Sequence, residues 1–150
     1  MNPCRCGYLG DASKECRKAP RCGEDYMARL SGPLLDRIDI CVAMQPFTPL
    51  HYMAETTGEA SAPVAARVLA ARQRQYKRQD GQKNCEAGLE ILEVSSTAQD
   101  MAQKVAARFR FSARGYTRMM RVARTIADLA CEEAVLVNHV AEAATYRLPS

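Results

Sequence analysis

The 150 residues of this chain are 47% hydrophobic and 25% charged, a composition that excludes collagen-like, mucin-like and disordered proteins. The net formal charge of +4, from 21 basic and 17 acidic residues, is too small to indicate a nucleic-acid binder by itself. No apolar run reaches the roughly 18 residues that span a bilayer, and the opening MNPCRCGYLG has no signal-peptide core. We therefore expect a soluble, cytoplasmic protein with no membrane partner.

The first third of the chain is rich in Cys, Gly and Pro and shows little helical periodicity. Residues 23 to 35 carry apolar side chains at spacings of four, which predicts a short helix broken at Gly32 and Pro33. Residues 37 to 44 alternate between apolar and polar or small side chains, a pattern typical of a half-buried strand. The apolar positions of this predicted strand are Ile38, Ile40, Val42 and Met44.

The remainder of the chain has helical periodicity. After a polar connector at residues 54–62, four helices are expected near 63–80, 96–110, 112–129 and 137–147, which predicts a helical bundle over residues 63–150. Pro63 suits a first helical turn, Ser96 with Gln99 suggests a capping box for the second helix, and Ser112 precedes the third. The expected inward side chains are Val64, Val68, Ala71, Tyr76, Met101, Val105, Phe109, Tyr116, Met119, Met120, Ala123, Ile126, Val140, Ala141 and Ala144.

Four of the seven cysteines, Cys4, Cys6, Cys16 and Cys22, lie within nineteen residues of each other. Four soft thiolates suit a tetrahedral Zn²⁺ ion, and a looped segment can fold around the metal because metal binding supplies the stability that a small core cannot. A disulfide and unmetallated thiols are the alternatives. A site closed by four cysteines leaves no open position for substrate, so the zinc would be structural. Cys41, Cys85 and Cys131 are isolated, and we assign them no chemistry.

The predicted helical region is unevenly charged. No acidic residue occurs between Glu59 and Asp80 or between Asp100 and Asp128, although both intervals are rich in arginine. In the third predicted helix, Arg114, Arg118 and Arg121 follow helical spacing and form one basic stripe. Such a stripe suits nucleotide phosphates at a subunit boundary or a nucleic-acid backbone. A solvated helix face neutralised by nearby acidic residues is the plain alternative.

Familiar catalytic sets are poorly represented. The two histidines, His51 and His139, pair with no nucleophile at a recognisable spacing, and His139 is expected at the surface. None of the five lysines follows a glycine, so the phosphate-binding loop GxxxxGK[ST] is absent from these residues. The chain alone should not hydrolyse ATP.

Three separated segments, in the same order, closely resemble the magnesium-chelatase-like AAA+ ATPases of the competence-protein ComM type. They are MNPCRCGYLGD at residues 1–11, LSGPLLDRID at 30–39 and FSARGYTRMMRVARTIADL at 111–129, and the likeness continues to AEAATYR at 141–147. The resemblance covers only the C-terminal part of that architecture. It implies a truncated end of an AAA+ core with a zinc-stabilised loop and one terminal strand in residues 1–53, followed by an α-helical lid in 63–150. The phosphate-binding loop and the Mg²⁺-binding strand would both lie upstream of Met1.

The resemblance also implies roles for individual residues. Arg37 matches an arginine finger that one subunit inserts into the ATP site of its neighbour, where it would stabilise charge on the transferring phosphoryl group. Asn2 matches a polar residue that senses the γ-phosphate, and Arg114 matches the lid arginine that reaches the same phosphate. Arg118 and Arg121 are possible phosphate or DNA contacts. In this family a second Cys-x-Cys pair is common, whereas this chain has Lys18 at the later position and offers Cys22 instead.

The sequence therefore predicts the C-terminal piece of an ATPase that remodels DNA as a homo-oligomeric ring, with ATP and Mg²⁺ bound only in the complete protein. One alternative is a stand-alone zinc-binding nucleic-acid module without ATPase activity. Another is a truncated gene product with no independent activity. If Arg37 has no finger role, an ion pair with Asp36 or Asp39 is the expected alternative.

Overall fold

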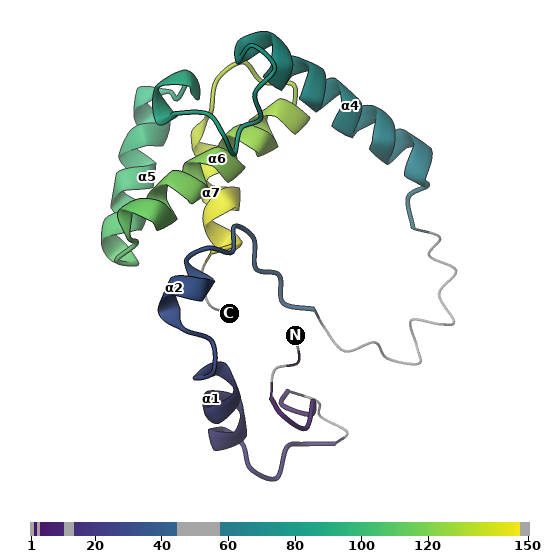
Figure 1. Ribbon diagram of the computed structural model, residues 1–150, viewed down its shortest axis with the longest axis vertical. Helices are drawn as coiled ribbons and strands as arrows, with labels where there is room; N and C mark the ends of the chain where they lie inside the picture. Colours follow the sequence, from purple (N-terminus) through teal and green to yellow (C-terminus); the bar gives the residue numbers. More distant parts are fainter. Residues whose placement is uncertain (1, 3, 11–13, 45–57, 148–150) are drawn as a thin grey trace. The chain divides into compact units, whose positions relative to one another are not determined.

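The computed structural model describes residues 2, 4–10, 14–44 and 58–147, which fall into two compact units (Figure 1). The N-terminal unit runs to Ile38 and also includes Met44. The helical unit consists of Asp39–Ala43 together with the residues from position 58 onward. None of the helices in these described ranges is both long and apolar enough to cross a membrane.

The N-terminal unit contains two short helices, α1 (Arg21–Met27) and α2 (Gly32–Leu35). The predicted break at Gly32 and Pro33 is instead the start of α2, and the preceding helix has already ended at Met27. Proline fits this position because the first turn of a helix has no intrahelical acceptor for its backbone N–H. The backbone N–H of Arg37 then donates to the carbonyl of Leu34 at 3.0 Å, which places Arg37 directly after α2.

The strand predicted over residues 37 to 44 does not form. Ile40, Val42 and Met44 are 52%, 62% and 86% exposed, and Cys41 N–H donates to the Tyr146 carbonyl at 2.8 Å. An alternating pattern provides an apolar face, but a strand also needs a neighbouring strand whose backbone groups form hydrogen bonds with its own. In the described parts of the chain, the only β-bridge is an isolated one between Val94 and Val135.

The helical unit contains α4 (Ser61–Arg78), the 3₁₀ turn η1 (Leu89–Ile91), α5 (Ser96–Arg108), α6 (Ala113–Leu129) and α7 (Val137–Thr145). The four predicted helices are confirmed to within a few residues. Helix α6 contacts α4, α5 and α7, and α5 also packs against α7 (Figure 1). The chain is thus mainly helical, as the sequence predicts.

The core of the helical unit combines small and medium-sized side chains. One buried cluster includes Met119 and Met120 of α6, Val140 of α7, and Leu92 and Val135 from the loops. Small residues let helix backbones approach closely, so van der Waals contact is made without large side chains. The buried alanines are Ala87, Ala98, Ala102, Ala123, Ala127, Ala143 and Ala144.

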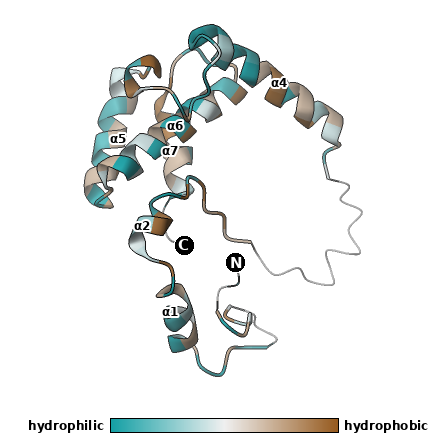
Figure 2. Ribbon diagram, in the orientation of Figure 1, coloured by the Kyte–Doolittle hydropathy of each residue, from teal (hydrophilic) through white to brown (hydrophobic). Residues whose placement is uncertain are grey.

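Helix α4 packs through its C-terminal half. Its buried residues are Ala71 and Gln75, whereas the predicted inward residues Val64, Val68 and Tyr76 are 36%, 47% and 46% exposed. Hydrophobic bands on α4 are visible among its polar residues (Figure 2). Apolar spacing predicted the helix correctly and its contact face only in part.

Helix α5 departs from the sequence prediction at both ends. Its N-cap is Ser95, whose hydroxyl accepts from the backbone N–H of Ala98 at 3.3 Å, and Ser96 is the first helical residue. At the other end, Phe109 is 42% exposed, although the spacing placed it inward. Ser112 does cap α6, accepting from Gly115 N–H at 3.0 Å, as predicted.

Candidate functional site

The structure brings the four N-terminal cysteines into one cluster. The Sγ atoms of Cys4, Cys6, Cys16 and Cys22 all lie within 4.8 Å of one another. Two of the separations are 3.2 Å, between Cys4 and Cys6, and 3.3 Å, between Cys6 and Cys16. Cys4 and Cys16 are buried, and none of the four forms a disulfide.

Two tight turns assemble this cluster. The backbone N–H of Gly7 donates to the Cys4 carbonyl at 3.1 Å, and Gly7 has a φ of +84°, a conformation that glycine adopts without strain. On the other side, Ala19 N–H donates to the Cys16 carbonyl and Cys22 N–H to the Lys18 carbonyl, each at 2.9 Å. Both turns fold the chain back so that cysteines distant in sequence face each other.

The thiols of the cluster have shifted pKa values. Burial raises the pKa of Cys4, but hydrogen bonds from the Cys6 thiol and from three backbone N–H groups outweigh burial and lower it to about 6. For Cys16, a backbone N–H at Lys18 favours the thiolate, while the neighbouring thiols and burial together raise its pKa to about 12. Cys4 therefore loses its proton more readily than an ordinary cysteine, whereas Cys16 keeps its proton more strongly.

The donor set fits a structural zinc ion. Zinc bonds thiolate sulfur at about 2.3 Å in a tetrahedron, which requires sulfur atoms about 3.8 Å apart. The separations of 3.2 Å and 3.3 Å and the 4.8 Å limit bracket that value. Cys22 belongs to the set, as expected for a chain that has Lys18 where its relatives have the later cysteine of the second pair. Cys41, Cys85 and Cys131 are exposed and remain outside the cluster.

Arg37 and Asn2, the two predicted nucleotide contacts of the N-terminal unit, both have exposed side chains. Arg37 lies two residues after the end of α2, which begins at Gly32 and Pro33. Asn2 Nδ2 would lie 3.8 Å from a Cβ added at Gly7, so Asn2 sits beside the first turn of the cysteine cluster.

The three arginines of the predicted stripe on α6 differ in their surroundings. Arg114, in the first turn, is exposed. Arg118 forms an ion pair with Asp39. Arg121 donates to the Ala87 carbonyl through Nε at 3.2 Å and Nη2 at 2.8 Å. The phosphate or DNA roles of Arg118 and Arg121 therefore stay predictions, and Arg114 is the arginine of this set that is most accessible.

A buried polar network joins α4 to α6, and sequence reasoning missed it. Arg78 donates two hydrogen bonds to the Asp128 carboxylate, and Asn84 donates one at 2.8 Å. Arg124, fully buried, pairs with Asp128 at 3.0 Å and donates to the carbonyls of Glu132, Glu133 and Leu92. From the sequence, Arg124 is assigned no role, and Asp128 is only one of the acidic residues that could neutralise a solvated helix face. Their helical i, i+4 spacing was the available signal.

His139 is buried and has a structural role, although a surface position was expected. It is 2% exposed, and its Nδ1 accepts the backbone N–H of Leu136 at 3.1 Å. The side chain therefore caps the start of α7, which corrects the prediction of a surface residue. His51 lies outside the described residues.

Both parts of the chain match models of known protein families. Residues 58–147 match the family described as magnesium chelatase, subunit ChlI C-terminal, and residues 1–51 match magnesium chelatase, subunit ChlI. The first match alone covers more than half of the chain. The chain belongs to the magnesium-chelatase-like family, and the likeness to the ComM type is confirmed.

Individual relatives share the similarity along almost the whole chain. This chain is 34% identical to the protein YifB of Escherichia coli and to the competence protein ComM of Haemophilus influenzae, in each case over 98% of its own length. It is 31% identical to the protein Mb2921c of Mycobacterium bovis over 97% of this chain. The matched region makes up 29% of the first two relatives and 30% of the third, so the chain spans about three tenths of their length.

Proposed function

We propose that this chain is the nucleotide-sensing and lid portion of a ComM-like AAA+ ATPase that acts on DNA as a homo-oligomeric ring. In this proposal ATP and Mg²⁺ are bound by an ATP-binding core, and this chain donates arginines to that site. Family membership and the exposed arginine after α2 support the proposal. The chain on its own has no ATPase activity because it carries no phosphate-binding loop.

The exposure of Arg37 is the observation that carries the proposal. A finger acts on a neighbouring subunit's nucleotide, so its side chain must lie at the surface of its own subunit. Arg37 meets that requirement, because its side chain is exposed directly after α2. A guanidinium placed in a neighbour's ATP site stabilises the charge of the transferring phosphoryl group.

Arg114 and Asn2 have supporting roles in this proposal. Arg114 extends from the first turn of α6, where it is exposed, and would contact the γ-phosphate as the lid closes. Asn2 would orient the attacking water beside the same phosphate. The acid-free intervals around α4 and α6 add positive charge that favours a DNA backbone as the partner of the assembled ring.

The four-cysteine cluster has a structural role in the proposed function. Cys4, Cys6, Cys16 and Cys22 would hold Zn²⁺, which supplies stability to a unit whose described residues include few buried ones. The metal would thereby fix the turns on either side of the cluster. It takes no part in the chemistry because all four positions are filled by protein.

Replacement of Arg37 in the complete ATPase tests the proposal. We expect Arg37→Ala to lower ATP hydrolysis by about 10³-fold or more, the usual effect of losing an arginine finger, and to leave ATP binding largely intact. Arg17→Ala removes an exposed arginine from the same unit and should change neither quantity. An equal loss of binding and hydrolysis in Arg37→Ala would contradict the finger role.

A further inference from the structure

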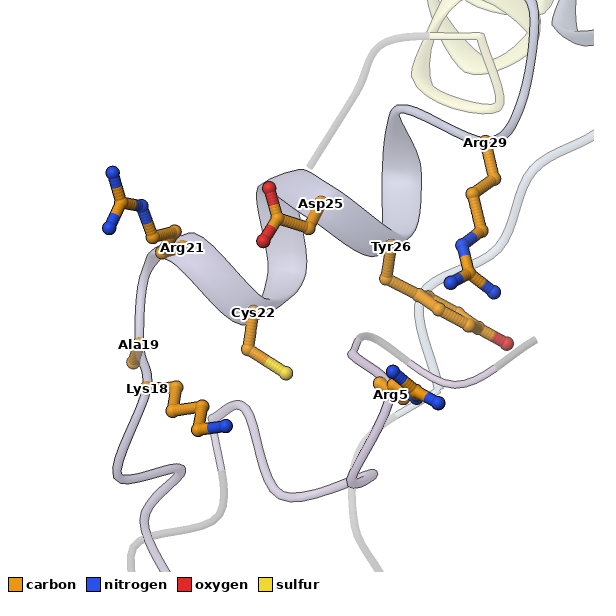
Figure 3. A pocket seen from close by; sticks show the side chains of 8 residues that line it. All are labelled: Arg5, Lys18, Ala19, Arg21, Cys22, Asp25, Tyr26 and Arg29. Carbon is orange, nitrogen blue, oxygen red and sulfur yellow. The ribbon is translucent and has the colours of Figure 1, made fainter.

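A cavity lies directly beside the cysteine cluster. Its volume is about 570 Å³, within the range of roughly 300–1,000 Å³ typical of small-molecule sites. Cys22, a member of the cluster, is also part of its wall (Figure 3). The other lining residues are Arg5, Lys18, Ala19, Arg21, Asp25, Tyr26 and Arg29.

The wall of the cavity is strongly basic. Four of its eight residues are cationic and one, Asp25, is acidic, a net formal charge of +3 around one small space. None of the four cationic side chains forms an ion pair with an acidic group in the parts of the chain that the structure describes. Like charges gathered in this way repel one another unless an anion lies between them.

The side chains are arranged around an aromatic ring. The Lys18 ammonium and the Cys22 sulfur point toward the same space, Arg29 approaches the ring of Tyr26, and Arg5 lies on the other side of that ring (Figure 3). Arg21 points away from it. Guanidinium groups bind phosphate oxygens through paired N–H donors, and an aromatic ring stacks on a nucleic-acid base.

Three of the four cations lie next to or within two positions of a cluster cysteine in the sequence. Arg5 lies between Cys4 and Cys6, Lys18 follows Cys16 by two positions, and Arg21 directly precedes Cys22. The turns that gather the thiols therefore also gather the positive charges. A metal in the cluster would hold these cations together against their repulsion.

We propose that this cavity, which we call the basic pocket, binds a nucleotide unit, with its phosphate on Arg5, Lys18 and Arg29 and its base on Tyr26. The ligand is either a free nucleotide or one unit of a single-stranded nucleic acid. Ordering of the pocket by the metal rests on the zinc site proposed above. Binding at the pocket does not depend on Arg37 or on ATP hydrolysis.

Binding of a labelled six-nucleotide oligothymidine to the zinc-loaded chain, followed by fluorescence anisotropy, tests the basic pocket. Arg29→Ala and Arg5→Ala should each weaken binding about tenfold or more, because each removes a charge-assisted contact to phosphate. Asp25→Asn should tighten binding by removing the one acidic group. Arg17→Ala is the matched control, since it removes the same charge outside the pocket, and should weaken binding less than about threefold.

The role of Tyr26 has its own test. Tyr26→Leu should weaken oligothymidine binding about fivefold to a hundredfold through lost stacking, and should leave binding of an abasic oligomer of the same length unchanged. Equal loss for both oligomers would overturn the base contact. Competition by ATP and by inorganic phosphate identifies the source of the ligand. If micromolar ATP displaces the oligothymidine, the ligand of the basic pocket is a free nucleotide. If ATP does not displace it, the ligand is a nucleic-acid strand.

Three results would overturn the proposal. The first is an Arg17→Ala effect as large as that of Arg29→Ala, which would indicate general attraction to a positive surface. The second is polyglutamate binding as tightly as the oligonucleotide, which would indicate an acidic protein partner. The third is the absence of any binding by a chain that carries its zinc. Measuring the zinc content of every variant separates failure of the pocket from failure of the metal site.

Discussion

Arg78, at the C-terminal end of α4, and Asp128, in the last turn of α6, form a two-armed ion pair although fifty residues separate them. The Nη1 to Oδ1 distance is 2.8 Å and the Nη2 to Oδ2 distance is 3.0 Å, and the Asp128 side chain is fully buried. Because α4 buries only Ala71 and Gln75 of its own residues, this polar contact is a main attachment of α4 to α6.

Removal of the Asp128 charge should strongly destabilise the helical unit. Asp128→Asn keeps the shape of the side chain but leaves the buried Arg124 without its carboxylate partner. We expect the free energy of unfolding to fall by about 3–5 kcal/mol, the usual effect of breaking a buried ion pair. Urea denaturation followed by far-ultraviolet circular dichroism measures this loss. Asp100→Asn, on the exposed side of α5, is the control and should stay within about 0.5 kcal/mol of the unaltered chain.

The same carboxylate predicts how stability depends on pH. Burial raises the pKa of Asp128, but hydrogen bonds from Arg78 and Asn84 and the charges of Arg124 and Arg78 outweigh burial, so its pKa in the folded chain lies below the ordinary value. The folded state therefore binds this proton more weakly than the unfolded state. The stabilisation is complete above the unfolded-state pKa of about 3.9 and is lost as the pH falls through the folded pKa. The stability gap between the unaltered chain and Asp128→Asn should narrow below about pH 4. A gap that widened there would contradict this assignment.

Arg114 and Arg121 should respond differently to truncation, although both lie on the predicted stripe. Arg121→Ala leaves the carbonyl of the buried Ala87 without its donors and should cost about 1–3 kcal/mol of folding stability. Arg114→Ala removes an exposed side chain and should change stability by less than about 0.5 kcal/mol. Thermal unfolding of the two variants makes the comparison. Equal destabilisation would mean that Arg114 also has a structural role.

The cysteine cluster should contain zinc. We expect about one zinc ion per chain in protein purified under reducing conditions without chelator, because four thiolates complete a tetrahedral site. Cys16→Ser should lose the metal and loosen the N-terminal unit, as increased proteolysis there would report. Cys85→Ser, at an exposed cysteine outside the cluster, should retain it. Metal-free protein, or full zinc content in Cys16→Ser, would exclude the site.

Local patterns in the sequence were sufficient for the helices and for the cysteine cluster. Helical spacing and cap residues depend on neighbours along the chain, and Ser112 caps α6 as predicted. The error at Ser95 and Ser96 was a single position, since adjacent serines offer the same chemistry. The spacing of Cys4, Cys6, Cys16 and Cys22 indicated one site because a single ion can join ligands from two turns.

Features that depend on distant contacts could not be predicted in the same way. Residues 37 to 44 alternate as a strand does, but a strand is made by its partner, and no neighbouring strand pairs with them in the described parts of the chain. The burial of Arg124 and Asp128 could not be predicted because it depends on how α4 packs against α6. The basic pocket was hidden because its cations are dispersed in sequence and become neighbours only after the cysteines are brought together.

Mixing of inactive subunits tests most directly whether Arg37 acts in a neighbouring subunit of the complete ATPase. One population carries Arg37→Ala, and the other carries a substitution of the phosphate-loop lysine in the ATP-binding core. Neither population should hydrolyse ATP alone. A mixture should recover hydrolysis, because an interface between the two joins an intact phosphate loop to an intact Arg37. Mixed assemblies that remain inactive, or Arg37→Ala subunits that hydrolyse ATP at the unaltered rate, would contradict the account.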